Sequence, residues 1–276
     1  MAAKSALSAA GLEASQLDCI VSACSVMEQV IPCLASQVQH KLGLGETGVP
    51  AFDINATCLS FLVALDQLAC AMAAGRYRRV LLVSSEIPSI GLNPEERSTA
   101  PLFGDGAAAV VLETCGDENG SALLASHLET YGIGGDYCRF RAGGTRYWRK
   151  PSTSATAEPS SAFFEMDGRA LLRLAKRHFP VFLGRLLAKS GLTLGEFALV
   201  VPHQASGRAL AHLPPMLGIA AERIINILAS HGNQVAASLP SALHHAISSG
   251  RLQRGDCFAL LGTGAGVSLG ALVLRY

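Results

Sequence analysis

An internal repeat restricts the fold of this chain more than any other feature of its sequence. Residues 11–21 (GLEASQLDCIV) align without gaps on residues 191–201 (GLTLGEFALVV). Each copy has a glycine that can end a helix, followed by a polar turn and an apolar stretch typical of a strand. Because the two copies lie much farther apart than the period of a solenoid, the repeat indicates two homologous half-domains.

A second pair of segments repeats at a slightly shorter separation. Residues 58–76 (CLSFLVALDQLACAMAAGR) align on residues 233–251 (NQVAASLPSALHHAISSGR), and both copies end in Gly-Arg after an apolar-periodic helix. This alignment places Cys58 and Asn233 at equivalent positions, each at the start of its helix. The sequence therefore predicts that each half supplies one helix N-terminus to a site at the join between the halves.

Predicted strands and helices alternate along the chain. The expected strands are residues 19–23, 51–54, 80–84, 163–166, 199–202, 224–228, 258–262 and 268–274, and the expected helices are residues 1–10, 31–42, 58–74, 168–190, 206–217 and the segment after 233. Such alternation is typical of an α/β protein with parallel sheets built from βαβ units. The helices that start at Cys58 and Asn233 have no clean polar face, so we expect them to lie buried between two sheets.

Three regions of the chain differ in character. Residues 1–131 are expected to form the N-terminal half, and residues 162–276 the C-terminal half. Between them, residues 132–161 form a Gly-, Ser- and Pro-rich loop. One acid, Asp136, stands in this loop beside five cations, which are Arg139, Arg141, Arg146, Arg149 and Lys150. The loop is either an electropositive rim for a phosphorylated carrier or a solvated loop, and its sequence leaves both interpretations open.

The N-terminal half lacks a segment that the C-terminal half has. A strand and a full helix precede Gly191, whereas only ten residues precede Gly11. We therefore expect the first strand of the N-terminal half, and most of its first helix, to be missing. An empty position in the centre of a sheet would leave two strand edges unpaired, which is costly.

The composition excludes several classes of protein. Of the 276 residues, 50% are hydrophobic and 16% are charged, and the net charge of +1 gives no reason to expect a nucleic-acid partner. The first residues lack the apolar core of a signal peptide, and no apolar run approaches the roughly 18 residues of a membrane span. The eight cysteines form no CxxC pair, so we expect reduced thiols, a cytoplasmic location and no metal site.

Three residues are candidates for chemistry. Cys58, at a helix start, is expected to feel the helix dipole and free N–H groups, which would lower the pKa of its thiol. His203 directly follows the apolar strand 199–202, and open α/β sheets place their sites at the carboxyl ends of strands. Asn233 can cap its helix or donate a hydrogen bond to a thioester or enolate oxygen. Each also has a purely structural interpretation, as a buried thiol, a strand-end histidine or an N-cap.

These three residues, with the motifs around them, resemble the β-ketoacyl-ACP synthase III family of the thiolase superfamily. The motifs are ATCLS at 56–60, LFGDGAAAVVL at 102–112, VPHQASGRAL at 201–210, SHGNQVAASLPSAL at 230–243 and LLGTGAGVSLGALVLRY at 260–276. They follow the family's order over nearly the whole chain. The resemblance implies a thiolase-like αβαβα fold of two duplicated halves, in a family whose sequence would begin about fifty residues earlier, as the repeat also suggests.

The resemblance also implies an acyltransferase that makes a 3-oxoacyl product by decarboxylative Claisen condensation. Cys58 would take an acyl group from acyl-CoA or acyl carrier protein, and His203 and Asn233 would hold the carbonyl of a malonyl-type thioester. Backbone N–H groups of Cys58 and Ala265 would form the oxyanion hole. The thioesters are substrates, and no cofactor is implied.

Three further residues match substrate-binding positions of the family. Arg208 matches its carrier-docking arginine, and Arg97 matches an arginine near the adenine end of CoA. Ile31 matches the position that reaches across a homodimer into the partner's acyl pocket. The resemblance thus implies acyl carrier protein and CoA thioesters as partners and a homodimer, with neither nucleic acid nor membrane.

The chain departs from the family around its Gly-rich turn at 262–266. Thr263 stands where an aromatic residue is usual, and Val267 and Leu269 also replace common aromatics. These differences favour a specialised-metabolite pathway over fatty acid initiation, or acyl transfer to an oxygen or nitrogen nucleophile. A non-catalytic partner subunit or truncated paralogue is a further alternative. A papain-like hydrolase is disfavoured, because that family's motif around the cysteine is absent.

Overall fold

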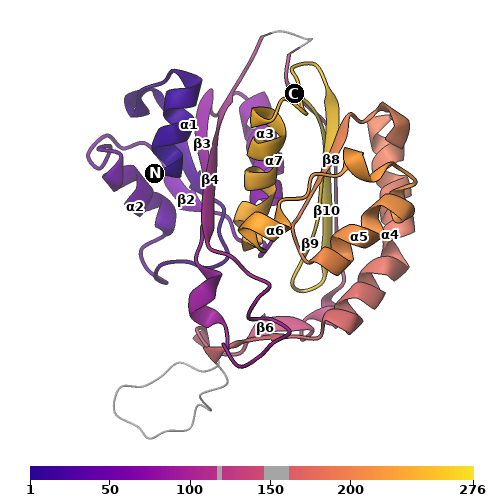
Figure 1. Ribbon diagram of the computed structural model, residues 1–276. Coiled ribbons are helices and arrows are strands. Elements are labelled where there is room, and N and C mark those ends of the chain that lie inside the picture. Colours follow the sequence, from indigo (N-terminus) through magenta and orange to yellow (C-terminus); the bar gives the residue numbers. More distant parts are fainter. Residues whose placement is uncertain (117–119, 146–161) are drawn as a thin grey trace, which may run out of the picture.

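The computed structural model describes residues 1–116, 120–145 and 162–276. Its elements form five layers in the order helix, sheet, helix, sheet, helix, which confirms the predicted αβαβα architecture (Figure 1). Helices cover both faces of each sheet, so the inner strands can be apolar on both sides. Within the described ranges, no helix has the length and hydropathy needed to cross a membrane.

The first sheet has the strand order β2-β1-β3-β4. Its strands are β1 (Cys19–Ser22), β2 (Ala51–Asp53), β3 (Arg79–Glu86) and β4 (Gly106–Glu113). The first three are parallel and confirm the predicted strands, whereas β4 is an additional strand that runs antiparallel to β3. All four residues of β1 are buried, as expected for an inner strand.

The second sheet has the order β5-β10-β9-β8. Its strands are β5 (Ala122–Thr130), β8 (Leu199–Pro202), β9 (Cys257–Gly264) and β10 (Ser268–Arg275). Strands β8 and β9 are parallel, and β10 is antiparallel to both of its neighbours. A separate short pair joins β6 (Cys138–Phe140) to β7 (Phe164–Met166).

The predicted strand 224–228 is wrong. Ile224 makes only an isolated bridge with Val200. The Ile227 N–H donates to the side chain of Gln204 at 2.9 Å instead of to a strand, and the chain then forms α6 (Leu228–His231).

The long helices lie either between the two sheets or on their outer faces (Figure 1). The central pair is α3 (Ser60–Ala73) and α7 (Ser238–Ser248); the outer helices are α1 (Ala2–Ala10) and α2 (Leu34–Lys41) on the first sheet, and α4 (Gly168–Ser190) and α5 (Gly207–Leu217) on the second. The largest buried apolar cluster joins both sheets to the central pair, and one further cluster lies under each outer layer. The expected burial of the central helices is therefore confirmed.

Short 3₁₀ helices lie in several connections. They are Ala14–Gln16, Pro88–Gly91, Gly132–Gly134, Leu194–Glu196, Ala221–Arg223 and Val235–Ala237. Helix α2 begins at Leu34 rather than at 31, because Asp53 of β2 accepts hydrogen bonds from the Leu34 and Ala35 N–H groups, each at 2.8 Å.

The first repeat, which aligns Gly11 on Gly191, is confirmed. Both glycines end a helix in the left-handed conformation, with φ of 65° and 66°. A capping box follows in each half, and the strands β1 and β8 come next in the same alignment. Local structure therefore repeats as the sequence predicts in this part of the two halves.

The second repeat, which aligns Cys58 on Asn233, holds only at the ends of the central helices. Gly75 and Gly250 follow α3 and α7 with φ of 74° and 71°. However, α3 has 14 residues and α7 has 11. An ungapped alignment that matches the ends of the two helices therefore mismatches their starts by three residues.

Hydrogen bonds give the correct match at the helix starts. Asn55 Oδ1 accepts from the N–H group two residues later at 2.9 Å, and Asn233 Oδ1 makes the same bond at 2.9 Å. Ser60 and Ser238, the first residues of α3 and α7, likewise each accept from the N–H group four residues before at 2.9 Å. The predicted equivalence of Cys58 and Asn233 is therefore wrong: Asn233 corresponds to Asn55, and Cys58 corresponds to Ala236.

The predicted division into halves also needs correction. Strand β5 lies within residues 1–131 but pairs with β10, so it belongs to the second sheet. The predicted loop 132–161 contains β6, and its remaining part from 146 to 161, with Arg146, Arg149 and Lys150, lies outside the described residues. Strand β5 covers the edge of β10, whereas no described strand covers the corresponding edge of β4. The unpaired edge therefore belongs to β4, the outermost strand, and not to a gap at the centre of the first sheet.

Candidate functional site

Cys58 lies in a tight turn two residues before α3, and not within the helix as predicted. The Ser60 hydroxyl donates to the Thr57 carbonyl at 2.6 Å and accepts from the Ala56 N–H at 2.9 Å. Thr57 has φ of 55°, a conformation that is rare for a β-branched residue and that persists only when its surroundings enforce it. The backbone N–H groups of Cys58 itself and of Ala265 favour the charged form of the Cys58 thiol.

The expected lowering of the Cys58 pKa is wrong. Burial raises the pKa of this thiol to about 12, with smaller contributions from nearby Cys138 and from the charge of Glu86. The two N–H groups oppose this shift but are outweighed. The helix dipole cannot compensate, because loss of hydration penalises a buried thiolate strongly. Cys58 is therefore a thiol, and not a thiolate, in the unliganded protein at neutral pH.

His203 lies at the carboxyl end of β8, as predicted. The backbone N–H of His203 donates to the Leu261 carbonyl of β9 at 2.7 Å, and the residue is only 5% exposed. Burial lowers the pKa of the imidazole to about 4, so His203 is neutral at physiological pH. Among the described residues, its Nδ1 atom has no hydrogen-bond partner. A neutral imidazole in this state can accept a proton or donate one hydrogen bond to a ligand.

Asn233 is held by a segment from the other half of the molecule. Its N–H donates to the Leu102 carbonyl at 2.9 Å, and its carbonyl accepts from the Gly104 N–H at 3.1 Å. The approach is so close that a Cβ on Gly104 would lie 2.0 Å from the His231 carbonyl oxygen. The side-chain amide is oriented by the bond from Val235 to Oδ1, which leaves Nδ2 as a donor with one long contact of 3.3 Å, to the Ala205 carbonyl.

The glycines of β9 bring these segments together. A Cβ on Gly262 would lie 2.7 Å from the Leu59 side chain and 3.1 Å from Cβ of His203, and a Cβ on Gly264 would lie 2.8 Å from the Thr57 hydroxyl. The Cys58 turn and His203 therefore pack on adjacent positions of one strand. Asn233 lies near them as well, because its Nδ2 contacts the carbonyl of Ala205, two residues after His203. The predicted residues Cys58, His203, Asn233 and Ala265 thus converge at the join between the halves.

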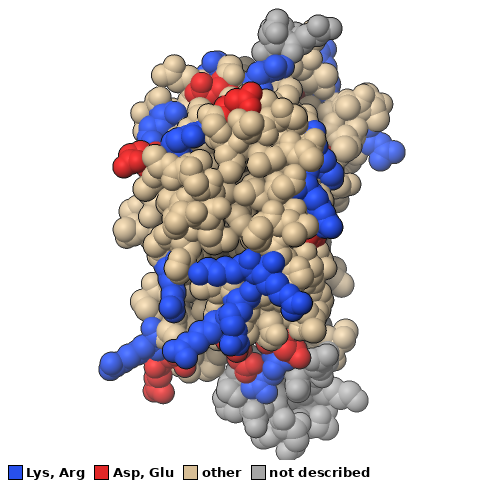
Figure 2. All heavy atoms as spheres, turned by 90° about the vertical axis from the view of Figure 1, so that its right-hand side faces the viewer, with Lys and Arg blue, Asp and Glu red and all other residues tan. Residues whose placement is uncertain are grey.

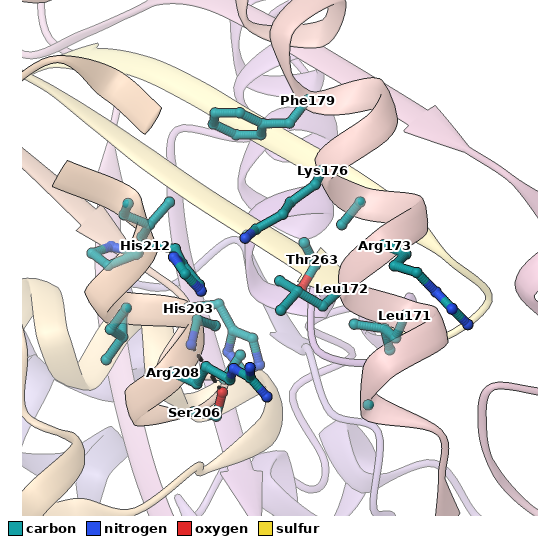
Figure 3. A pocket seen from close by; sticks show the side chains of 18 of the residues that line it. Leu171, Leu172, Arg173, Lys176, Phe179, His203, Ser206, Arg208, His212 and Thr263 are labelled. Atoms are coloured by element: carbon teal, nitrogen blue, oxygen red, sulfur yellow. Dashed lines mark hydrogen bonds between the residues drawn. The ribbon is translucent and has the colours of Figure 1, made fainter. Parts of the chain in front are cut away.

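A cavity of about 890 Å³ opens between α4 and α5 and reaches His203 and Thr263 (Figure 3). Its apolar wall includes Leu171, Leu172, Phe179, Leu213 and Met216. Its cationic residues are Arg169, Arg173, Lys176 and Arg208, with His212 beside them, and Asp167 is the one carboxylate among the lining residues that the structure describes. Figure 2 shows lysine and arginine side chains gathered on the face of the molecule that α4 and α5 form. This composition suits a long, partly apolar ligand that carries negative charge.

The remaining predicted binding residues lie in different places. Arg208 lines the cavity, as expected. Arg97 is exposed and lies next to Ser98, which lines the cavity, but Arg97 itself does not. Ile31 is 82% exposed in the loop before α2 and does not line the cavity. Within one chain the structure does not bring Ile31 to the site, so its contact across a dimer stays a prediction.

The prediction of a basic binding surface names the residues of the predicted loop 132–161 and does not include those of α4. Arg139 and Arg141 of that loop both pair with Glu165, so their charge is largely compensated within the fold. Arg169, Arg173 and Lys176 have spacings of four and three residues, which place them on one face of a helix. That spacing is the signal that could have identified them.

Comparison with known proteins identifies the family. The model described as "3-Oxoacyl-[acyl-carrier-protein (ACP)] synthase III" matches residues 52–132, and the model of the C-terminal part of the same enzyme matches residues 187–276. "Beta-ketoacyl-[acyl-carrier-protein] synthase III" of a Synechocystis species is 35% identical over 279 residues, which cover all of this chain and 81% of that protein. The protein of that name from Pseudomonas aeruginosa is 37% identical over 278 residues and is covered to 80%.

A solved structure agrees with these sequence matches. The crystal structure of 3-oxoacyl-[acyl-carrier-protein] synthase III from Aquifex aeolicus superposes with a TM-score of 0.87 at 34% identity, over all of this chain and 83% of the other. The similarity therefore includes both half-domains and the join at which Cys58, His203 and Asn233 lie. On this evidence the chain belongs to the 3-oxoacyl-[acyl-carrier-protein] synthase III family of condensing enzymes.

Proposed function

We propose that this condensing enzyme transfers an acyl group from a thioester to Cys58 and then condenses it with a malonyl-type thioester to give a 3-oxoacyl product. One observation carries the proposal: the backbone N–H groups of Cys58 and Ala265 both act on the Cys58 thiol, in a turn that packs beside a neutral His203. Two N–H groups beside a buried cysteine can hold the oxygen of a tetrahedral acyl intermediate that forms on its sulfur.

In the acylation step, the sulfur of Cys58 attacks the thioester carbonyl and the carbon–sulfur bond to the donor breaks. The pKa of Cys58, raised to about 12, means that its proton must leave as the new bond forms. Neutral His203 can take this proton and pass it to the departing thiolate, which leaves as a thiol. The N–H groups of Cys58 and Ala265 would hold the negative charge that develops on the carbonyl oxygen.

In the condensation step, Asn233 Nδ2 and His203 would donate hydrogen bonds to the carbonyl of the malonyl-type thioester. Loss of CO₂ leaves an enolate on that oxygen, and the enolate carbon attacks the acyl carbon on Cys58. The carbon–sulfur bond then breaks, and the released thiolate takes up a proton. The long Asn233–Ala205 contact of 3.3 Å supports this role, because a substrate oxygen could replace it at little cost.

We infer that the thioesters are carried by acyl carrier protein or CoA and enter through the basic cavity between α4 and α5. Its cations, Arg169, Arg173, Lys176 and Arg208, suit a phosphate group or the acidic surface of a carrier, and its apolar wall suits a thioester arm. Arg97, exposed beside the cavity, is a further candidate for the nucleotide end of CoA. A homodimer would bring Ile31 of one chain to the acyl pocket of the other.

Intact-protein mass spectrometry tests the first half of this proposal. Incubation with a series of acyl-CoA donors should add one acyl group to the protein, and Cys58→Ala should abolish the addition. Cys70→Ala serves as a matched control, because Cys70 is an exposed cysteine near the far end of α3. Addition that persists in Cys58→Ala, or that is lost only in Cys70→Ala, would contradict the assignment of the nucleophile.

Acyl transfer to an oxygen or nitrogen nucleophile is the second candidate function. The observation that favours it is Thr263, a small polar residue that lines the cavity together with His203 and leaves room for a bulky acceptor. Neutral His203 would then remove the proton of the acceptor. Both functions share the acyl-cysteine, so they differ only in the fate of the acyl group.

A further inference from the structure

Glu86 is a fully buried acid at the end of β3, and neither proposed reaction step uses it. Its Oε1 accepts from the Ser25 N–H and its Oε2 from the Val26 N–H, both at 2.7 Å. The turn before α7 packs against β3, and the Ala236 N–H in that turn favours the charged form of the same carboxyl group. Burial raises the pKa of Glu86 to about 7, and the three donors oppose that rise by stabilising the carboxylate. They explain how Glu86 can remain in the core, because a buried charge is tolerated when it is fully hydrogen-bonded.

Because the fold is duplicated, the surroundings of Glu86 in one half can be compared with those of Cys58 in the other. In the alignment that places Asn55 on Asn233, Ala236 is the counterpart of Cys58, and Glu86 is the counterpart of Gly264. In one half, the Cys58 N–H faces the space beside Gly264 and Ala265, where the thiol lies. In the other half, the turn with Ala236 packs against β3, and the side chain of Glu86 lies beside that turn.

The Glu86 carboxylate also holds the segment that presents Asn233. Val235 donates to Asn233 Oδ1 at 2.9 Å, and the N–H of the next residue, Ala236, favours the charged form of the Glu86 carboxyl group. Val235 has φ of 50°, like Thr57 in the other half, so this turn adopts a conformation that its contacts must enforce. A shift of the Ala236 N–H would turn Val235 and release the amide of Asn233.

We propose that Glu86 is a positioning residue for condensation, whose carboxylate fixes the turn 233–237 through the Ala236 N–H and so aims the Asn233 amide at the malonyl thioester. This inference rests on the proposed function and deepens it, because it assigns a task to a residue outside the reacting groups. It predicts that Glu86 affects condensation much more than acylation, although its charge lies near enough to influence Cys58.

The variant Glu86→Gln tests this role. Glutamine has the same shape but offers one acceptor oxygen, and its NH₂ group would face an N–H donor. Loss of a hydrogen bond to a charged group should lower kcat of condensation about tenfold or more, with KM for a malonyl thioester nearly unchanged. The rate of Cys58 acylation by acyl-CoA should stay within about twofold of the original protein. Glu113→Gln is the matched control, because Glu113 is an exposed glutamate of the same sheet and should affect neither step.

Glu86→Asp provides a second variant in case the amide destabilises the fold. It keeps the carboxylate but is one methylene shorter, so it cannot reach all three donors, and it should show the same selective loss. Condensation equal to that of the original protein in both variants, or an equal loss of acylation and condensation, would overturn the positioning role. Failure of the unaltered protein to acylate or condense would instead overturn the proposed function and this inference with it.

Discussion

At Cys58 two physical effects oppose each other. The N–H groups of Cys58 and Ala265 favour the thiolate, whereas burial favours the neutral thiol, and burial prevails because the pKa rises to about 12. At His203 burial acts in the other direction and lowers the pKa to about 4. Both side chains are therefore uncharged at neutral pH, so a substrate enters a site without a formed ion pair. Sequence position predicts that these two residues lie at the site, but it cannot give their protonation states, since these depend on burial by other elements.

Replacement of Asn233 should separate the two reaction steps. Asn233→Ala removes the Nδ2 donor, so condensation should slow about a hundredfold or more, as for loss of an oxyanion donor. Acylation of Cys58 should remain within about twofold, because Asn233 has no part in that step. Single-turnover acylation and steady-state condensation measure the two rates. Asn226→Ala, at an exposed asparagine near α6, is the control, and an equal loss of both steps in Asn233→Ala would contradict the assigned role.

The lowered pKa of His203 should appear in the pH dependence of stability. A histidine whose pKa is about 4 when folded and about 6.5 when unfolded contributes stability above pH 6.5 that is lost as the pH falls towards 4. Urea unfolding at pH 7 and pH 5 should therefore show a loss in the original protein, relative to His203→Gln, on the order of 2 kcal/mol. Identical pH dependence in both proteins would show that His203 is not buried in its neutral form.

The sequence predicts the existence of the two central helices but not the residues at which they start. Apolar periodicity correctly predicts α3 and α7 as buried helices, and both end at a glycine with positive φ. The ungapped alignment misplaces their starts by three residues, because α7 is three residues shorter than α3. Only the hydrogen bonds of Asn55 and Asn233 reveal the correct match.

The basic faces of α4 and α5 should affect carrier recognition and not chemistry. The double replacement Arg173→Ala with Arg208→Ala should raise KM for a carrier-bound malonyl thioester several-fold and leave kcat nearly unchanged. The effect should shrink at high salt, because exposed charges are screened. Arg177→Ala is the control, since Arg177 is exposed on α4 but does not line the cavity. A fall in kcat at constant KM, or an equal effect of Arg177→Ala, would contradict a docking role.

For the molecule as a whole, the repeat predicts most of the architecture. Two halves with matched turns at Gly11 and Gly191 form two sheets with helices between and outside them, as the sequence implies. The boundary between the halves is not predictable in this way, because β5 follows β4 in the chain yet pairs with β10, the last strand. A pairing between residues so far apart leaves no local signal. The same applies to the cavity, whose walls come from α4, α5 and β9.

The two halves also divide their tasks differently from the prediction. Cys58 and Asn233 are not equivalent positions of the repeat. Cys58 corresponds to Ala236, and Asn233 corresponds to Asn55. Under the proposed function, the duplicated scaffold is asymmetric: the nucleophile lies in one half and the donors to the second thioester lie in the other.

The fate of the acyl group on Cys58 tests this account most directly. The acylated protein, freed of excess donor, should be mixed with a malonyl thioester, and both protein mass and product should be followed. We predict that the acyl adduct disappears and that a 3-oxoacyl thioester, lengthened by the malonyl-derived unit, appears with release of one CO₂ per product. An adduct that survives, or an acyl group that leaves unlengthened on an oxygen or nitrogen acceptor, would contradict condensation as the function of this protein.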